Sequence, residues 1–200
     1  ERAEGYQIVQ GLMAIASGIA YTAYRLFLDV QRGIFERFAT MPIARSAALW
    51  GHVLTSLVSS ALSVCVIVLV ALLMGFRSSA DIGAWLAVGG ILALFTLALT
   101  WIAVIAGLTA KTVDGASAIA MPLVFLPFIS SAFVPTATMP VPVRVFAENQ
   151  PVTAIVNTLR SLLAAQPADE SIWAALAWCV GIMVVAYGIA IRLYNRRATR

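Results

Sequence analysis

The amino-acid sequence predicts an all-α, polytopic membrane protein that forms a single transmembrane domain over residues 1–200. Of its 200 residues, 62% are hydrophobic and only 11% are charged, and the mean hydropathy is +0.94. Soluble domains carry about 25% charged residues, and a soluble protein this apolar would expose large hydrophobic patches. Five apolar runs reach the length of about 20 residues that crosses a bilayer. Lipid is therefore the expected solvent for most outward-facing side chains.

The five predicted transmembrane helices differ in length and in proline content. The fourth is the shortest, and Pro122 and Pro127 within it predict a kink. The sequence begins with Glu1 and lacks the basic and then apolar pattern of a signal peptide. We therefore expect that a first span is missing and that the intact protein has six. The five spans are residues 6–28, 52–75, 83–108, 115–134 and 172–194.

The distribution of Lys and Arg predicts the orientation in the membrane. With alternating spans, nine of the 13 basic residues fall on one side and four on the other. Because cytoplasmic loops are enriched in Lys and Arg, we expect the side with nine to face the cytoplasm. These nine residues are Arg25, Arg32, Arg37, Arg45, Lys111, Arg192, Arg196, Arg197 and Arg200.

Segment 30–42, on the basic side, has the pattern of a short amphipathic helix. Four apolar residues recur at helical spacing, Glu36 and Arg37 face elsewhere, and Pro42 ends the helix. Such a helix either lies on the membrane surface with its arginines on lipid phosphates or docks on a cytoplasmic partner. The pattern alone favours neither interpretation. The four apolar positions are Ile34, Phe35, Phe38 and Met41.

The outer segment 135–165 begins with three prolines and then becomes helical. The run Glu148-Asn149-Gln150-Pro151 comes before an apolar stripe at helical spacing, and proline suits the first turn of a helix. A helix of about 14 residues is ~21 Å long at 1.5 Å per residue. This is shorter than the ~30 Å hydrocarbon core. We therefore expect an interfacial or re-entrant helix.

The sequence shows no convincing catalytic or metal-binding constellation. His52 is the only histidine, and Ser56 lies one helical turn away, but a serine hydrolase needs further partners that the pattern lacks. One histidine and two distant cysteines do not make a zinc site. The phosphate-binding sequence G-x-x-x-x-G-K-[ST] is absent, so we do not expect this chain to hydrolyse ATP. The basic residues lie at the ends of apolar runs, which argues against a nucleic-acid partner.

Hydroxyl residues form a stripe on the second span. Thr55, Ser59 and Ser63 share one face, with Ser56 and Ser60 beside them. Such a stripe marks helix packing or lines a polar transport path, and we favour packing because hydroxyl groups can bond the backbone of their own helix. No acidic residue lies deep in a span. This disfavours a carrier driven by protons or sodium and favours an external energy source.

Two motifs carry a family resemblance. The first is Glu36-Arg-Phe-Ala-Thr-Met-Pro-Ile-Ala-Arg45. The second is Ser130-Ser-Ala-Phe-Val-Pro135 with Met139-Pro140 and Phe146-Ala-Glu-Asn-Gln-Pro-Val-Thr153. Both motifs, in this order and spacing, resemble the permeases of type 2 ABC exporters, most closely the daunorubicin-resistance-like drug-export permeases. The likeness extends over essentially the whole chain.

The resemblance implies a pair of six-span permeases in a bacterial cytoplasmic (inner) membrane, bound to two separate ATP-binding cassette ATPase subunits. ATP would bind those partners, and the permease would hold no cofactor. Lys111 and Asp114 would form a second, smaller cytoplasmic contact. Residues 135–165, which include Glu148–Pro151, would form outer re-entrant helices that cap the exit of the transport pathway. The coupling helix that docks on the ATPase would consist of Ile34, Phe35, Glu36, Arg37, Phe38, Met41 and Pro42.

These features together predict the membrane-spanning subunit of an ATP-powered exporter. It would move a lipophilic or amphipathic compound outward, in company with a second permease copy or homologue and surrounded by membrane lipid. The alternative is a membrane scaffold that recruits a cytoplasmic partner without transport. A third possibility is an intramembrane hydrolase that depends on His52.

Overall fold

The computed structural model describes residues 2–32, 47–73, 80–125, 144, 149–164 and 171–198. Every regular element within these residues is an α-helix, which confirms the predicted all-α class. In chain order the helices are α1 (Arg2–Gln31), α3 (Ala47–Leu73), α4 (Ile82–Thr109), α5 (Val113–Phe125), α7 (Pro151–Leu163) and α8 (Ser171–Ala198).

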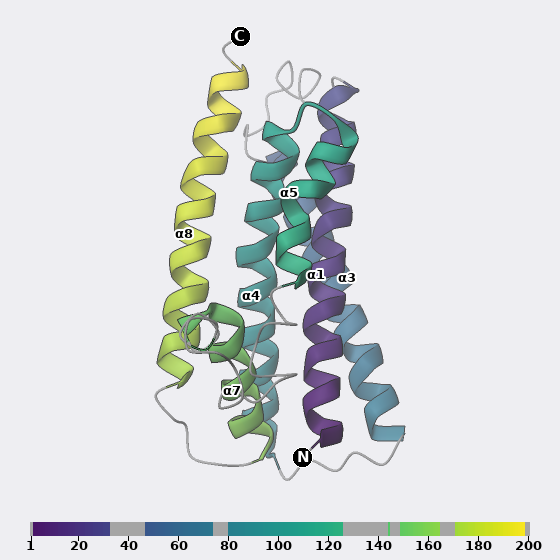
Figure 1. Cartoon of the computed structure of the whole chain (residues 1–200), viewed down its shortest axis with the longest axis vertical. Coiled ribbons are helices and arrows are strands. Elements are labelled where there is room, and N and C mark those ends of the chain that lie inside the picture. The colour runs from purple at the N-terminus through teal and green to yellow at the C-terminus, as the bar shows by residue number, and fades with distance from the viewer. Residues whose placement is uncertain are drawn as a thin grey trace.

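Four of the described helices are long and apolar enough to cross a membrane. The shortest of these stretches has 22 residues, which gives ~33 Å at 1.5 Å per residue against a hydrocarbon core of ~30 Å. The four helices lie side by side, and α3 runs antiparallel to α1, α4 and α8 (Figure 1). The candidate spans are Gln10–Gln31, Leu49–Leu73, Ile82–Thr109 and Ser171–Tyr194.

The fifth predicted span, residues 115–134, is described only in part. Helix α5 begins at Val113 and is described to Phe125, with Pro122 inside it. Residues 126–143 lie outside the described residues. The structure therefore supports four candidate spans, and the fifth stays a prediction.

One end of the bundle carries most of the basic side chains that the structure describes. At this end α1, α4 and α8 finish and α3 begins, while α7 lies near the opposite end (Figure 1). We call this end the basic end. It carries the exposed side chains of Arg32, Lys111, Arg192 and Arg196, as the charge distribution of the sequence predicts.

Helix α4 is the centre of the bundle. Its span is 67% buried within the protein, against 17% for α3 and 22% for α8, and it contacts all five other described helices. The outward faces of α3 and α8 expose large apolar side chains such as Leu62, Leu73 and Val185. Because only lipid solvates such surfaces, these faces are consistent with a bilayer around the bundle.

Helices α4 and α1 approach each other closely at Gly107, which has no side chain of its own to separate them. A β-carbon added there would lie 2.9 Å from Cδ2 of Leu26 and 3.0 Å from the carbonyl oxygen of Ala23. Small residues at helix crossings let backbones approach closely in membranes. Gly107 therefore sets the distance between α1 and α4 toward the basic end.

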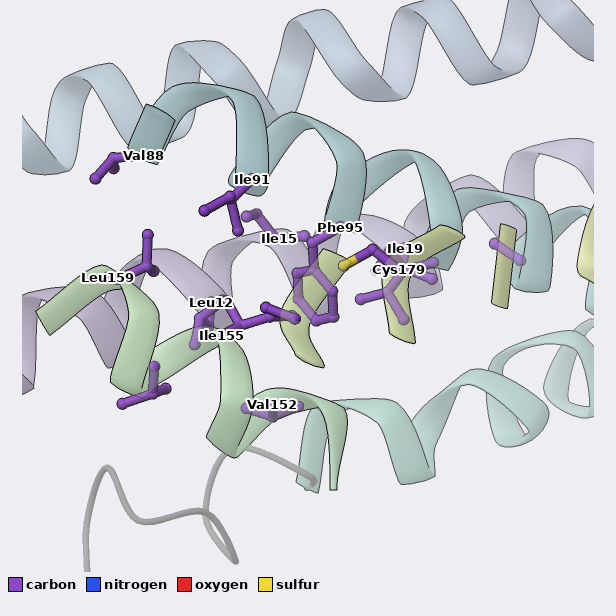
Figure 2. Close-up of a cluster of buried hydrophobic side chains, with 14 of the residues drawn as sticks. Leu12, Ile15, Ile19, Val88, Ile91, Phe95, Val152, Ile155, Leu159 and Cys179 are labelled. Carbon is purple, nitrogen blue, oxygen red and sulfur yellow. The ribbon is translucent and has the colours of Figure 1, made fainter. Parts of the chain in front are cut away.

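Helix α7 packs its apolar face into the half of the bundle away from the basic end. Val152, Ile155 and Leu159 are buried and point toward Phe95 of α4 and Leu12 of α1 (Figure 2). The helix has 13 residues and begins with Pro151, so the helix predicted after this proline is present. Its neighbours are α8, α4 and α1.

The helix ends differ from the predicted limits by a few residues. Helix α1 continues through Gln31, so residues 30 and 31, assigned to the coupling helix by the sequence pattern, belong to α1. The reason is that no glycine or proline interrupts the sequence between Gly18 and Gly33. Helix α3 starts at Ala47, before the predicted limit at residue 52, because alanine and leucine favour helix there.

Candidate functional site

The predicted coupling residues lie outside the described residues. The structure does describe the two helices that flank them, because α1 ends at Gln31 and α3 begins at Ala47. The described geometry therefore concerns the last turn of α1 and the first turns of α3, which flank this segment. We call these helix ends the base of the predicted coupling segment. The residues outside the description are Ile34, Phe35, Glu36, Arg37, Phe38, Met41 and Pro42.

A close polar contact between a histidine and an aspartate joins α1 to α3 next to the predicted coupling segment. Nε2 of His52, in the second turn of α3, lies 3.1 Å from Oδ2 of Asp29, in the last turn of α1. Both side chains are partly buried, with 19% and 25% of their surface exposed, so water screens the contact less than at an open surface. The pair closes the base of the predicted coupling segment.

The sequence singled out His52 but not its partner. The contact could have been suggested by the positions of the two residues in the sequence. Asp29 lies in the last turn of α1 and His52 in the second turn of α3, and these two helix ends face each other. The Ser56 hydroxyl, one turn from His52, bonds to threonines instead. The geometry thus gives His52 a carboxylate partner on another helix and gives Ser56 a different set of partners.

A cluster of three hydroxyl groups connects α1, α3 and α4. Oγ of Ser56 lies 3.2 Å from Oγ1 of Thr22 and 3.2 Å from Oγ1 of Thr100. All three residues are buried. Each threonine hydroxyl also lies within donating distance of a carbonyl of its own helix, Thr22 to Gly18 at 2.9 Å and Thr100 to Thr96 at 2.7 Å.

The three hydroxyl groups of this cluster share three protons, since each carries one. When both threonines donate to the carbonyls of their own helices, the Ser56 hydroxyl donates to one of the two threonine oxygens. Each of the three protons then has an acceptor. Every hydroxyl is then satisfied inside the apolar bundle. We call Thr22, Ser56 and Thr100 the hydroxyl cluster; the sequence placed Ser56 beside the predicted stripe but did not identify this meeting point.

The predicted stripe itself faces away from the bundle. Thr55 and Ser59 are exposed and Ser63 is half-buried. The hydroxyl of Thr55 donates to the carbonyl of Gly51 at 2.8 Å, and that of Ser63 donates to the carbonyl of Ser59 at 3.0 Å. These groups are satisfied by their own helix, and the inward face of α3 carries Ser56 and Ser60 instead.

The second predicted cytoplasmic contact lies in the turn between α4 and α5. Lys111 in this turn and Asp114 in the first turn of α5 are both exposed, at the basic end. Phe27 of α1 packs against Ala110 and Ala116, which flank this turn. This contact holds the turn against α1 within one helical turn of Asp29. The predicted coupling segment and the turn that carries Lys111 are therefore both attached to the end of α1.

The predicted outer residues divide between surface and interior. Glu148 lies outside the described residues, Asn149 is exposed, and Gln150 is buried at the start of α7. Nε2 of Gln150 donates to Oγ1 of Thr153 at 3.2 Å. Among the described residues, the buried Oε1 of Gln150 has no hydrogen-bond partner. Pro151 occupies the first position of α7.

An aromatic cluster that the sequence analysis did not predict joins α3, α4 and α8. Trp101 of α4 is fully buried, with ring centroids 5.4 Å from Trp50 and 4.8 Å from Tyr187. Both contacts are edge-to-face, the arrangement that aromatic quadrupoles favour. The ring centroids of Trp50 and Tyr187 are also 6.4 Å apart, so this cluster helps to hold α3 and α8 against α4.

No group of three metal-ligating side chains occurs in the part of the chain that the structure describes. Both cysteines there are free, with Cys65 exposed and Cys179 buried. The described geometry thus provides helix-to-helix connections at the basic end and no metal centre.

Comparison with known proteins identifies the family. Residues 3–164 match the model of the ABC-2 type transporter family, and this range contains α4 and the helices packed around it except α8. The chain is 26% identical over 190 residues to the "Daunorubicin resistance ABC transporter permease protein DrrB1" of Streptomyces coeruleorubidus. That alignment covers 93% of this chain and 66% of the relative, so the chain spans just under two thirds of the relative's length. No solved structure gives a significant match. The chain therefore belongs to the ABC-2 type transporter family, as a multi-pass membrane permease.

Proposed function

We propose that this chain is the membrane-spanning permease of an ATP-powered exporter, driven by a separate ATPase bound at the basic end. Segment 34–42 is the coupling helix in this proposal, and Lys111 and Asp114 form a smaller contact beside it. The observation that carries the proposal is the 3.1 Å bond between Asp29 and His52. It joins the two helices that flank the coupling segment, so a displacement of that segment would reach both.

The contacts of α1 support transmission of such a displacement into the bundle. Gly107 brings the backbone of α4 directly against Leu26 and Ala23, and Phe27 packs on the turn that leads into α5. Tightly packed helices move as rigid bodies between discrete arrangements rather than deforming continuously. A push on the coupling segment would therefore tilt α1, α3 and α4 together.

The proposed cargo is a lipophilic or amphipathic compound. Outward faces of the described helices are apolar, so a compound that reaches the permease from the bilayer must tolerate lipid. The relative is named for resistance to daunorubicin, which makes that compound a suitable probe. We further propose that the basic end faces the cytoplasm of a bacterial cell and that a second permease copy or homologue completes the pathway.

Reconstitution with a candidate ATP-binding cassette ATPase from the same organism tests the proposal. The pair should co-purify, and vesicles with the ATPase outside should accumulate daunorubicin when ATP is added. A catalytically inactive ATPase variant is the control. Stable co-purification without ATP-dependent accumulation of any lipophilic probe would favour a scaffold that only recruits the ATPase. Absence of co-purification would remove the proposed coupling altogether.

A further inference from the structure

An apolar groove runs along the outside of the bundle between α4 and α8, which lie side by side in Figure 1. Its volume is about 630 Å³, within the ~300–1,000 Å³ range of ligand sites. Every side chain that lines it is apolar. The walls include Ile102 and Ile105 from α4 and Trp178, Gly181, Val185 and Ile189 from α8.

The same face of α8 becomes cationic where the groove reaches the basic end. Arg192 follows Val185 by seven residues and Ile189 by three, and Arg196 follows Ile189 by seven. Residues at these spacings share one helix face. Both arginine side chains are exposed. Two arginines therefore follow the groove on the same face of α8, and guanidinium groups bind phosphate well through their planar, multiply donating geometry.

We propose that this groove binds one anionic phospholipid from the membrane leaflet at the basic end. The phosphate, which carries the lipid's uncompensated negative charge, lies on Arg192 and Arg196, and one acyl chain extends along Ile189 and Val185 toward Gly181. From Gly181 to Arg192, α8 rises ~16 Å at 1.5 Å per residue. One leaflet contributes ~15 Å of the ~30 Å hydrocarbon core. The part of the groove from Gly181 to Ile189 thus lies within about one leaflet's depth of Arg192, and the groove continues along α8 beyond it to Ala174.

Charge distinguishes a lipid from a second copy of this chain as the occupant. Two copies related by a two-fold axis along the membrane normal would place equivalent residues at the same depth across an isologous interface. Contact through this groove would then bring Arg192 and Arg196 toward the same two arginines of the other copy. Like charges in proximity repel, whereas an anionic headgroup neutralises them. The inference does not depend on the exporter proposal.

Photocrosslinking tests the proposed site in the full chain. The protein is reconstituted with diazirine-labelled phosphatidylglycerol or with phosphatidylcholine of the same acyl chains, and labelled peptides are mapped. Phosphatidylglycerol should label α8 and the facing part of α4 more strongly than phosphatidylcholine does. Arg192→Gln should weaken that preference about fivefold, the ratio equivalent to ~1 kcal/mol per basic residue near an anionic surface. Arg32→Gln, an exposed arginine of the basic end on α1, should leave the preference unchanged.

A second pair of variants tests the acyl-chain track. Val185→Trp fills the groove and should abolish labelling of its walls. Val58→Trp places the same substitution on the exposed face of α3, outside the groove, and should not; the two valines are 61% and 68% exposed. Equal labelling by both lipids, or unchanged labelling in Val185→Trp, would overturn the proposal. So would a disulfide between copies carrying Val185→Cys in a Cys65→Ser background, because the groove would then face a second copy.

Discussion

Gly107 of α4 and Leu26 of α1 are so close that a β-carbon on the glycine would lie 2.9 Å from Cδ2 of the leucine. The neighbouring carbonyl oxygen of Ala23, at 3.0 Å, belongs to the backbone and cannot rotate away. This contact connects the central helix to the helix that leads into the predicted coupling segment. It is the most sharply constrained backbone approach among the glycines that the structure describes.

Gly107→Ala is expected to destabilise the protein by about 1–3 kcal/mol, the usual penalty for adding a methyl group to a filled interior. Unfolding in detergent by heat or by denaturant measures this change. Gly90→Ala on the same helix is the matched control, because no atom lies within 4 Å of its added β-carbon. Since alanine favours helix over glycine by up to ~1 kcal/mol, the control should be neutral or stabilising. Equal losses in both variants would contradict the close approach at Gly107.

Removal of either partner of the Asp29–His52 pair should cost a similar, small amount of stability. A hydrogen bond of this kind contributes about 0.5–1.5 kcal/mol, and partial exposure places the loss toward the lower end. Asp29→Asn, His52→Ala and the double variant form a thermodynamic cycle. The double variant should lose less than the sum of the two single losses, because both act on one interaction. Strictly additive losses would show that the two groups do not interact.

The hydroxyl cluster predicts a contrast between neighbouring serines of α3. Ser56→Ala should reduce stability by ~0.6 kcal/mol, the average for hydrogen bonds between membrane helices, because both threonines keep their own carbonyl acceptors. Ser59→Ala, on the exposed face, should have no measurable effect. Thermal unfolding of both variants in the same detergent makes the comparison. A larger loss from Ser59→Ala would mean that the exposed stripe packs against a partner.

The proposed coupling role predicts a specific defect for Phe38→Asp. A charge in place of an aromatic anchor should prevent docking on the ATPase, since aromatic residues dominate the binding energy of many interfaces. Co-purification of the ATPase should fall while membrane insertion stays normal. Gln31→Asp, at the exposed end of α1, is the control and should retain the ATPase. Normal recovery of the ATPase with Phe38→Asp would exclude this residue from the contact.

The proposed orientation predicts which cysteine substitutions react with an impermeant thiol reagent. In a Cys65→Ser background, Arg144→Cys should react from outside intact cells. Lys111→Cys should react only after the membrane is opened. Both positions are exposed, so access depends on the side of the membrane rather than on burial. The reverse pattern would place the basic end outside the cell.

Much of the fold could be predicted from particular stretches of sequence. The apolar runs around Leu62 and Phe95 predicted helices long enough to cross a bilayer, and Pro151 correctly marked the first turn of α7. The arginines and lysine of the basic end share one side, as the charge count required. The partnership of Asp29 with His52 could not be predicted, because it depends on how α1 and α3 are rotated and not on either sequence by itself.

The sequence by itself determined where four long apolar helices lie, their order and the end of the bundle that carries most of the positive charge. The tertiary structure alone decided that Ser56 and Ser60 face inward while Thr55 and Ser59 face outward. The physical reason is that both sides of a membrane helix can be apolar, one toward protein and one toward lipid. Hydropathy therefore reports the length of a span but carries little information about its rotation. That rotation is set by packing, as at Gly107, where the backbone of α1 leaves no room for a side chain.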